Sequence, residues 1–473
     1  MLFNSFEFAL LVLISICIYY LKPFSKFQVH ILIIASLVFY GYSNPALLAL
    51  FLSSVIINVT ASYLVVHGEP AKQKLFATIG VVVNLLILIF FKYGSLVGSM
   101  LFDVNSGAGA FLVNIPLPIG ISFFTFEGIS LVVDAYKGRE IPQYRSLVAK
   151  SITKHALNTT FFVAFFPHLI AGPILKAHDF IPQIKEKYFK NINWDFCFRK
   201  LVTGYFLKMV VADQISQQTF WIQYPFFEAK SSLVLVSMLF GYSMQIFADF
   251  AGYSLIAIGI AGLFGYRLME NFNFPYISTS FSEFWRRWHI SLSSFLKEYL
   301  YIPLGGNRKG EFRTYFNLFF TMALGGLWHG AAWSYAVWGI FHGLALGAER
   351  FFLQSAFSGT QQIGILRKLT GGLIVFSFVT LGWLLFKLTD ITQVYQFLVA
   401  IKNNGSKETS TQIVIYIIIY SLPVICYHAL YLVKKNAWLE PKVRFAEPFL
   451  FAVLLFMIFT NTGIGGDFIY FQF

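Results

Sequence analysis

Two tryptophan–histidine pairs, Trp288-His289 and Trp328-His329, are the residues of this chain best suited to chemistry. They lie within residues 283–350, where arginines, histidines and paired glycines interrupt otherwise apolar sequence. Ionisable side chains at membrane depth are costly and usually line a cavity or a pathway. A neutral imidazole titrates near neutrality and accepts a proton from a reacting group. The pairs therefore indicate an intramembrane site with a histidine base.

These residue types are compatible with three functional classes of membrane protein. They fit an enzyme with a histidine base, a transporter with a proton-relay histidine, or a haem protein with two histidine ligands. Tryptophans near a membrane boundary also serve as interfacial anchors. The three cysteines, Cys17, Cys197 and Cys426, are far apart in sequence and predict neither a metal site nor a disulfide.

Two pairs of cations stand close to the first histidine in sequence. Arg286 and Arg287 precede it, and Arg308 and Lys309 occupy a glycine-rich turn at residues 305–310. Such groups suit the phosphates of a ligand. The same charges also fit the positive-inside rule for cytoplasmic loops. We expect all four to face the cytoplasm and to contribute to binding a phosphate-bearing ligand.

The segments that carry the histidines are predicted to be helical. Residues 281–301 contain few helix breakers and are predicted to form one helix with an aromatic face at i, i+3, i+4 and i+7 spacing. Residues 314–326 are predicted to re-enter the membrane, which places Trp328-His329 deep within it. The aromatic face of the first helix consists of Trp285, Trp288, His289 and Leu292.

Composition fixes the class of the whole chain. Hydrophobic residues make up 57% of it and charged residues 12%, against roughly 25% charged in a soluble domain. The net charge of +13 comes from lysines and arginines in short loops, which indicates cytoplasmic loops rather than nucleic-acid binding. We predict an all-α polytopic membrane protein with about 11–13 membrane segments, some of them re-entrant or interfacial. Residues 1–473 are expected to form a single transmembrane domain.

Three further segments carry specific expectations. Residues 233–247 and 253–264 are predicted to be separate helices, with Asp249 between them as a possible helix cap. Residues 111–133 are predicted to cross the bilayer in one piece. Two prolines in residues 161–174 exclude a straight helix, so this segment is predicted to be re-entrant.

In these segments the sequence resembles the membrane-bound O-acyltransferase (MBOAT) superfamily, and most closely its bacterial alginate O-acetyltransferase (AlgI-like) branch. One departure is Leu255, which stands where family members often have an acidic residue and bears on the identity of the acceptor. The matching segments are residues 166–174, 179–183, 249–254, 270–276, 283–292, 299–308, 325–330 and 468–473.

The resemblance implies a ring of helices around a thinned centre, in a multi-pass protein of the bacterial cytoplasmic (inner) membrane. The catalytic centre is expected within about residues 249–350. His329 matches the catalytic histidine of the family, and His289 matches its second histidine position. Four further residues, Trp288, Trp328, Asp249 and Asn271, are expected to line the site.

The resemblance also implies the reaction and its partners. Acetyl-CoA would load from the cytoplasmic side, with no bound cofactor or metal, and the acetyl group would leave on the outer face. There a periplasmic or extracellular transferase of esterase-like fold would modify an exported polysaccharide, such as alginate, or a cell-wall glycan. The expected contacts are therefore membrane lipid, this partner and acetyl-CoA, without nucleic acid. Transfer of D-alanine from a carrier protein and non-enzymatic glycan transport remain alternatives, although acids are scarce in the apolar segments.

The C-terminal tail, residues 465–473, carries four aromatic residues in its last six. It could form an interfacial aromatic belt. It also resembles the tyrosine-bearing end of the small peptide that serves D-alanine transfer. Because Tyr470 is the only hydroxyl in the tail, we hypothesise that it relays the acyl group toward the outer partner.

Overall fold

A computed structural model describes residues 1–473 except 43, 104–105, 171, 357–363, 435–439, 464, 467 and 470–473. The described residues contain helices and connecting loops and no β-strand, which confirms the predicted all-α class. Six helical segments are long and apolar enough to cross a membrane, so the chain is a multi-pass membrane protein. The larger number of about 11–13 segments, which counts short and broken ones, stays a prediction. The six are Lys22–Gly41, Pro45–His67, Pro70–Leu101, Ser232–Leu263, Ile365–Lys387 and Thr411–Val433.

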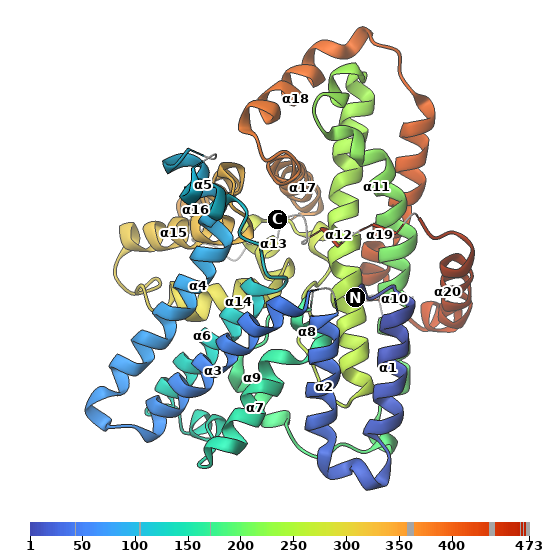
Figure 1. The fold of residues 1–473 in the computed structure, drawn as a ribbon. Coiled ribbons are helices and arrows are strands. Elements are labelled where there is room, and N and C mark those ends of the chain that lie inside the picture. The colour runs from blue at the N-terminus through green and yellow to red at the C-terminus, as the bar shows by residue number, and fades with distance from the viewer. Residues whose placement is uncertain are drawn as a thin grey trace. The chain divides into compact units, whose positions relative to one another are not determined.

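The chain forms two compact units, the first comprising Met1–Leu201 with Ser254–Met269, and the second Val202–Tyr253 with Glu270–Phe473. In the first unit α3, α4 and α6 pack so closely that a Cβ on Gly80 would lie 2.9 Å from Ala61 and 3.1 Å from Val132 (Figure 1). Its main helices are α1 (Phe6–Tyr19), α2 (Gln28–Gly41), α3 (Pro45–His67), α4 (Gln73–Leu101), α5 (Gly107–Val113), α6 (Ile121–Lys137), α7 (Ile152–Ala164), α8 (Phe166–Leu169) and α9 (Ala177–Phe180).

The predicted crossing at residues 111–133 is wrong, because α5 ends at Val113 and α6 begins only at Ile121. Two prolines lie in the connection, and Gly120 before α6 has a φ of 76°, a left-handed conformation that glycine adopts without strain. The proline-rich segment at residues 161–174 is broken as expected, into α7, the short α8 and a loop.

The two helices predicted at residues 233–247 and 253–264 are one helix, α12 (Ser232–Leu263), 32 residues long and green in Figure 1. Asp249 therefore lies in mid-helix and is not a cap. A Cβ on Gly252 would lie 2.9 Å from the Gly204 carbonyl oxygen. This glycine thus serves close packing against α10 (Trp194–Tyr205) instead of ending α12.

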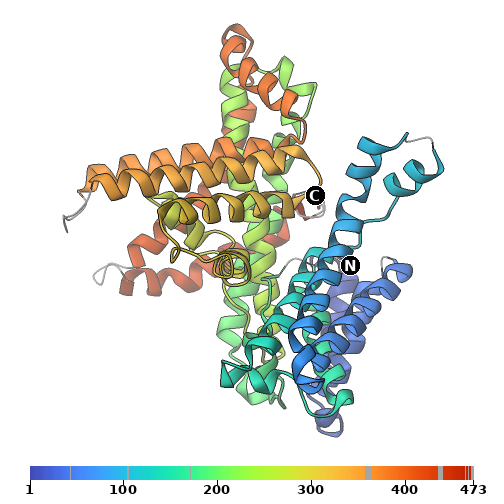
Figure 2. The same cartoon turned by 90° about the vertical axis from the view of Figure 1, so that its left-hand side faces the viewer.

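The second unit contains the segments with the two tryptophan–histidine pairs. Its helices α15 and α16 lie side by side, gold to orange in Figure 2. Gly326 and Gly339 permit this, since a Cβ on Gly326 would lie 2.8 Å from the Gly339 Cα. After α10 come a π-helical turn (Phe206–Ala212), α11 (Asp213–Thr219), α13 (Phe281–Arg287), α14 (Ile290–Leu296), α15 (Glu311–His329), α16 (Trp333–Ala356), α17 (Ile365–Lys387), α18 (Ile391–Asn403), α19 (Thr411–Lys434) and α20 (Glu440–Thr460).

Candidate active site around two buried histidines

The single helix predicted at residues 281–301 is wrong, because the chain breaks at the first tryptophan–histidine pair. Trp288 is extended and His289 has a φ of 43°, in the left-handed region. Such a conformation costs a non-glycine residue about 1–2 kcal/mol. Hydrogen bonds to an upstream loop stabilise the break: Ile290 N–H donates to the Asn271 carbonyl at 2.9 Å, and Asn273 N–H donates to the Arg287 carbonyl at 2.9 Å.

The start of α13 is fixed to α16 through its free backbone N–H groups. The Glu349 carboxylate on α16 accepts from the N–H groups of Phe281 and Ser282, the second at 3.1 Å. The Ser280 hydroxyl accepts from Glu283 N–H at 3.1 Å, as an N-cap serine does. α13 is therefore anchored at one end by α16 and at the other by the loop that carries Asn271.

Asn271 also orients the side chain of His289. Its Oδ1 accepts hydrogen bonds from Ser291 N–H at 3.2 Å and from the Ser291 hydroxyl at 2.9 Å, and it lies 3.1 Å from His289 Nδ1. Because a backbone N–H only donates, the Asn271 atom facing it must be the oxygen. His289 Nδ1 therefore donates to the same oxygen. In the neutral ring this leaves the lone pair on Nε2.

His329 is the last residue of α15, and its ring lies 6.5 Å from that of His289, centroid to centroid. The Trp328 indole contacts both imidazoles, at 6.1 Å from His289 and 5.0 Å from His329. Both histidines are almost fully buried, with 1% and 4% of their surface exposed. The structure therefore brings together the two histidines that sequence analysis singled out, 40 residues apart in the chain.

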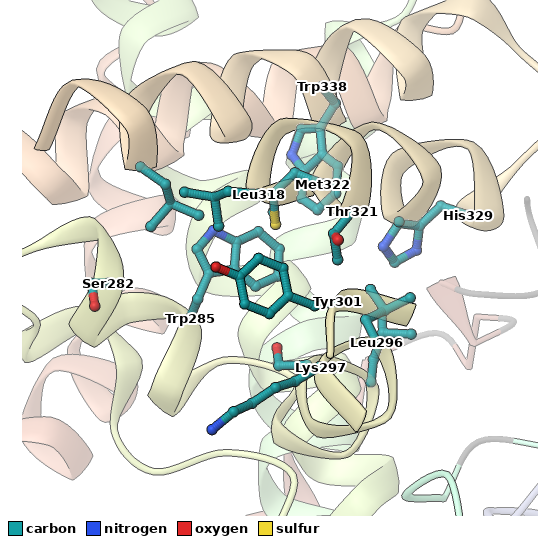
Figure 3. Close-up of a pocket in the computed structure, with 14 residues that line it drawn as sticks. Ser282, Trp285, Leu296, Lys297, Tyr301, Leu318, Thr321, Met322, His329 and Trp338 are labelled. Carbon is teal, nitrogen blue, oxygen red and sulfur yellow. The ribbon is translucent and has the colours of Figure 1, made fainter. Parts of the chain in front are cut away.

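A cavity of about 270 Å³ opens beside His329 (Figure 3). Its wall is mainly apolar, as is usual for sites that bind small molecules. His289 lies outside the wall, so it faces this cavity only through its neighbours. Among the described residues, no cluster of three or more His, Cys, Asp or Glu side chains is arranged to hold a metal ion. The lining residues on α13, α14 and the turn after it are Ser282, Trp285, Leu292, Ser293, Leu296, Lys297 and Tyr301, and those on α15 and α16 are Leu318, Thr321, Met322, Gly325, His329, Trp338 and Leu346.

The predicted cations differ in what they contact. Arg287 pairs with the Glu283 carboxylate at 2.9 Å and donates to the Asn273 carbonyl at 2.9 Å, so it stabilises the break at residue 288. Arg286, Arg308 and Lys309 are exposed. The cation on the cavity wall is Lys297, which sequence analysis missed; Figure 3 shows its ammonium group directed away from His329.

The other predicted lining residues lie around the histidines without bordering the cavity. Trp288 is buried in an aromatic cluster, 4.8 Å from Trp383 and 5.0 Å from Phe272 between ring centroids. Asp249 belongs to a buried ion cluster in which Lys208 Nζ lies 2.8 Å from Asp249 Oδ1 and 2.7 Å from Asp213 Oδ1. Sequence analysis did not identify Lys208 because its partners lie 5 and 41 positions away.

The same ion cluster holds the C-terminal tail. Lys208 Nζ donates to the Gly466 carbonyl at 3.1 Å, and Asp249 Oδ2 accepts from Ile469 N–H at 2.7 Å. The Phe468 ring packs 5.9 Å from that of Phe250, which in turn lies 4.6 Å from the His289 ring. Phe468 is therefore held one aromatic ring away from His289. Tyr470 lies outside the described residues.

The chain is similar to known membrane acyltransferases. Residues 121–388 match the sequence model of the MBOAT, membrane-bound O-acyltransferase family. The probable alginate O-acetylase AlgI of Azotobacter vinelandii is 38% identical over 416 residues, 86% of this chain and 79% of that protein. The peptidoglycan O-acetyltransferase of Helicobacter pylori is 34% identical over 422 residues, 83% and 78% of the two chains. The teichoic acid D-alanyltransferase of Bacillus subtilis is 30% identical over 247 residues, 50% and 59% of the two chains.

Proposed function

Because this chain belongs to the membrane-bound O-acyltransferase family and is an O-acyltransferase, we propose that it transfers acetyl groups from acetyl-CoA toward an exported glycan. One observation carries the proposal: His329 borders an apolar cavity, and a second buried histidine lies 6.5 Å away. Acetyl is favoured over D-alanyl because the relatives named for O-acetylation align with more than four-fifths of the chain, and the D-alanyltransferase with half.

In this mechanism His329 acts as the general base. Its neutral imidazole takes the proton from an acceptor hydroxyl as the oxygen attacks the thioester carbonyl. The carbon–sulfur bond then breaks, and the thiolate of CoA leaves and takes up the proton from His329. The products are an O-acetyl ester and free CoA, and the histidine returns to its neutral form.

His289 supports this step in the proposal, because Asn271 fixes the ring with the lone pair on Nε2. Trp328 packs against both imidazoles and limits their movement. A histidine side chain held in one rotamer and one tautomer spends more of its time in the geometry that the reaction needs. The catalytic roles therefore divide between His329 at the cavity and His289 behind it.

Donor binding is assigned to the cations and the cavity. Lys297 is exposed and borders the cavity, and Arg286, Arg308 and Lys309 are exposed nearby in sequence. We place these charges on the cytoplasmic side, where acetyl-CoA is available, in a bacterial inner membrane. The acceptor side then faces outward, toward a periplasmic or extracellular esterase-like transferase and its glycan.

The tail supplies the relay in this scheme, with Tyr470 accepting the acetyl group from the donor and passing it outward. The anchoring of Gly466 and Ile469 by the Lys208 cluster supports a fixed tail close to His289. The variant Tyr470→Phe removes only the hydroxyl. Full glycan acetylation by this variant would contradict the relay and leave the role of His329 untouched.

The main test uses the purified protein in lipid nanodiscs with radiolabelled acetyl-CoA. We expect free CoA and labelled ester to form, and His329→Ala to lower the rate by about 10²–10⁴-fold at an unchanged yield of folded protein. Near-normal transfer by His329→Ala would overturn the assignment of the base. Transfer of D-alanine from a charged carrier protein, with no use of acetyl-CoA, would replace acetyl with the D-alanyl alternative.

A further inference from the structure

One wall of the cavity lacks a side chain one helical turn before His329. Gly325 borders the cavity and precedes His329 by four residues on α15, so the two positions share a helix face and lie about 6 Å apart along the axis. Side chains in a helix lean toward its N-terminus. The His329 side chain therefore leans over the turn that carries Gly325.

The missing side chain of Gly325 leaves a notch in the cavity wall. A Cβ on Gly325 would lie 3.0 Å from Leu296 Cδ1. Apart from its adjacent residues and the backbone of α15, no other atom of the described residues would lie within 4 Å of that Cβ. Gly326 differs, since its Cβ would lie 2.8 Å from the Gly339 Cα. Gly326 thus serves helix packing, whereas Gly325 leaves space on the cavity side.

Leu296 of α14 closes this notch. Its side chain is half-buried and borders the same cavity, at the end where His329 lies (Figure 3). Because a Cβ is about 1.5 Å from its Cα, Leu296 Cδ1 lies no more than about 4.5 Å from the Gly325 Cα. A carbon chain that passed between them would need about 7–8 Å. A methyl group can therefore rest against both residues, but a longer chain cannot pass between them.

The notch lies where the proposed reaction places the acyl group. The acceptor oxygen must lie within about 3 Å of the imidazole, and the acyl carbon about 3–3.5 Å from that oxygen. The methyl group of an acetyl donor follows one bond later. It therefore lies about one helical turn from His329, which is the separation of Gly325 from His329.

We propose that Gly325 and Leu296 bind the methyl group of the acyl donor and restrict the donor to acyl chains of two carbons. This rests on the proposed function, transfer from a thioester at His329, and names the residues that select acetyl. A propionyl or longer chain would press against Leu296. A D-alanyl group would place a charged ammonium against the same apolar side chain, which is unfavourable.

The experiment measures kcat/KM of the purified protein in lipid nanodiscs with acetyl-CoA and with propionyl-CoA, together with the unfolding temperature. Leu296→Ala removes the side chain that stops a longer chain, and Leu296→Val is a milder form of the same change. Leu318→Ala is the matched control. It removes the same atoms from the wall of the same cavity, 11 residues before His329 and about 16 Å from it along α15.

We expect the wild-type protein to prefer acetyl-CoA about 10- to 200-fold, the discrimination that one methylene gives in an apolar pocket. Leu296→Ala should lower this ratio about 10-fold or more, Leu296→Val should lower it less, and Leu318→Ala should keep it. A wild-type ratio in both folded Leu296 variants would overturn the proposal. An equal fall in Leu318→Ala would overturn it too, since the volume of the whole cavity would then set the chain length.

A double variant tests whether Gly325 and Leu296 border one space. Gly325→Ala fills the notch and should lower kcat/KM for acetyl-CoA about 10-fold, whereas Gly347→Ala, which adds a methyl group on α16, controls for the added carbon. Adding Leu296→Ala to Gly325→Ala should restore part of the loss, because the new methyl group then has room. Additive losses would show that the two residues act separately and would contradict the notch.

Failure of this proposal can be distinguished from failure of the proposed function. If the wild-type protein releases CoA from neither donor, the proposed thioester donor is wrong and the acyl-length assignment falls with it. If the wild-type protein uses both donors equally, or the Leu296 variants keep its preference for acetyl-CoA, only the acyl-length assignment is wrong.

Discussion

Replacing Asn271 with leucine tests whether the orientation of His289 matters. The leucine side chain has a similar size but no acceptor, so it removes the oxygen that accepts from Ser291 N–H, from the Ser291 hydroxyl and from His289 Nδ1. Asn271 is 1% exposed and Ser291 is fully buried, so water does not replace these bonds readily. We expect His289 to lose its fixed tautomer and the break at residue 288 to loosen.

The structure sets the size of both effects. Three neutral hydrogen bonds contribute about 0.5–1.5 kcal/mol each, so Asn271→Leu should lower the free energy of unfolding by about 1.5–4.5 kcal/mol. Loss of one orienting bond to His289, about 1.4 kcal/mol, corresponds to an approximately 10-fold fall in kcat. Asn271→Asp keeps acceptor oxygens in place and should retain more of the activity.

The assay is CoA release from acetyl-CoA by protein that runs as a single folded species, with the unfolding temperature measured alongside. Asn403→Leu, at an exposed position near the end of α18, controls for the added leucine. Full activity of a folded Asn271→Leu protein would refute the reasoning about the tautomer. Equal losses in the Asp and Leu variants would show that the amide itself, rather than an acceptor, is required.

Three further substitutions follow from the packing. Lys208→Met leaves Asp213 and Asp249 as uncompensated buried charges and should destabilise the protein by about 3–5 kcal/mol, read as a large fall in unfolding temperature; a wild-type value would contradict the ion cluster. Gly326→Ala pushes a methyl group into the backbone of α16 and should cost about 1–3 kcal/mol, whereas Gly347→Ala, whose Cβ meets only Tyr315 at 3.7 Å, should be tolerated. Lys297→Gln should raise KM for acetyl-CoA several-fold with little change in kcat, measured against Lys402→Gln on α18; equal KM values would remove Lys297 from the donor site.

Sequence patterns predicted the structural features that depend on composition and local spacing. They failed for features that are determined by contacts between residues far apart in the sequence. The excess of apolar residues predicted the helical membrane class, because hydrocarbon tolerates little else. The break at residue 288 was missed because residues 281–301 contain neither glycine nor proline. The bonds that stabilise the break come from Asn271 and Asn273, 14 to 19 positions upstream, and no local pattern encodes them.

The sequence also predicted only some of the residues of the candidate site. His289, His329 and Trp328 were identified from residue type and come together in the structure. Lys297 was missed because no local pattern in the sequence shows that it borders the cavity. Trp288 was predicted to line the site, whereas in the structure its ring is buried in an aromatic cluster beside Trp383.

The continuous helix α12 links the C-terminal tail to His289. Asp249 holds the backbone of Ile469, and the next residue, Phe250, contacts the rings of both His289 and Phe468. One turn further along, the Tyr253 ring lies 4.3 Å from that of Phe468. A helix that ended near Asp249, as the sequence suggested, would leave the tail and the histidine on separately moving segments. Because α12 continues through this point, a single helical turn positions Phe468 and Ile469 relative to His289. The buried ion pair with Lys208 makes a carboxylate in mid-helix tolerable.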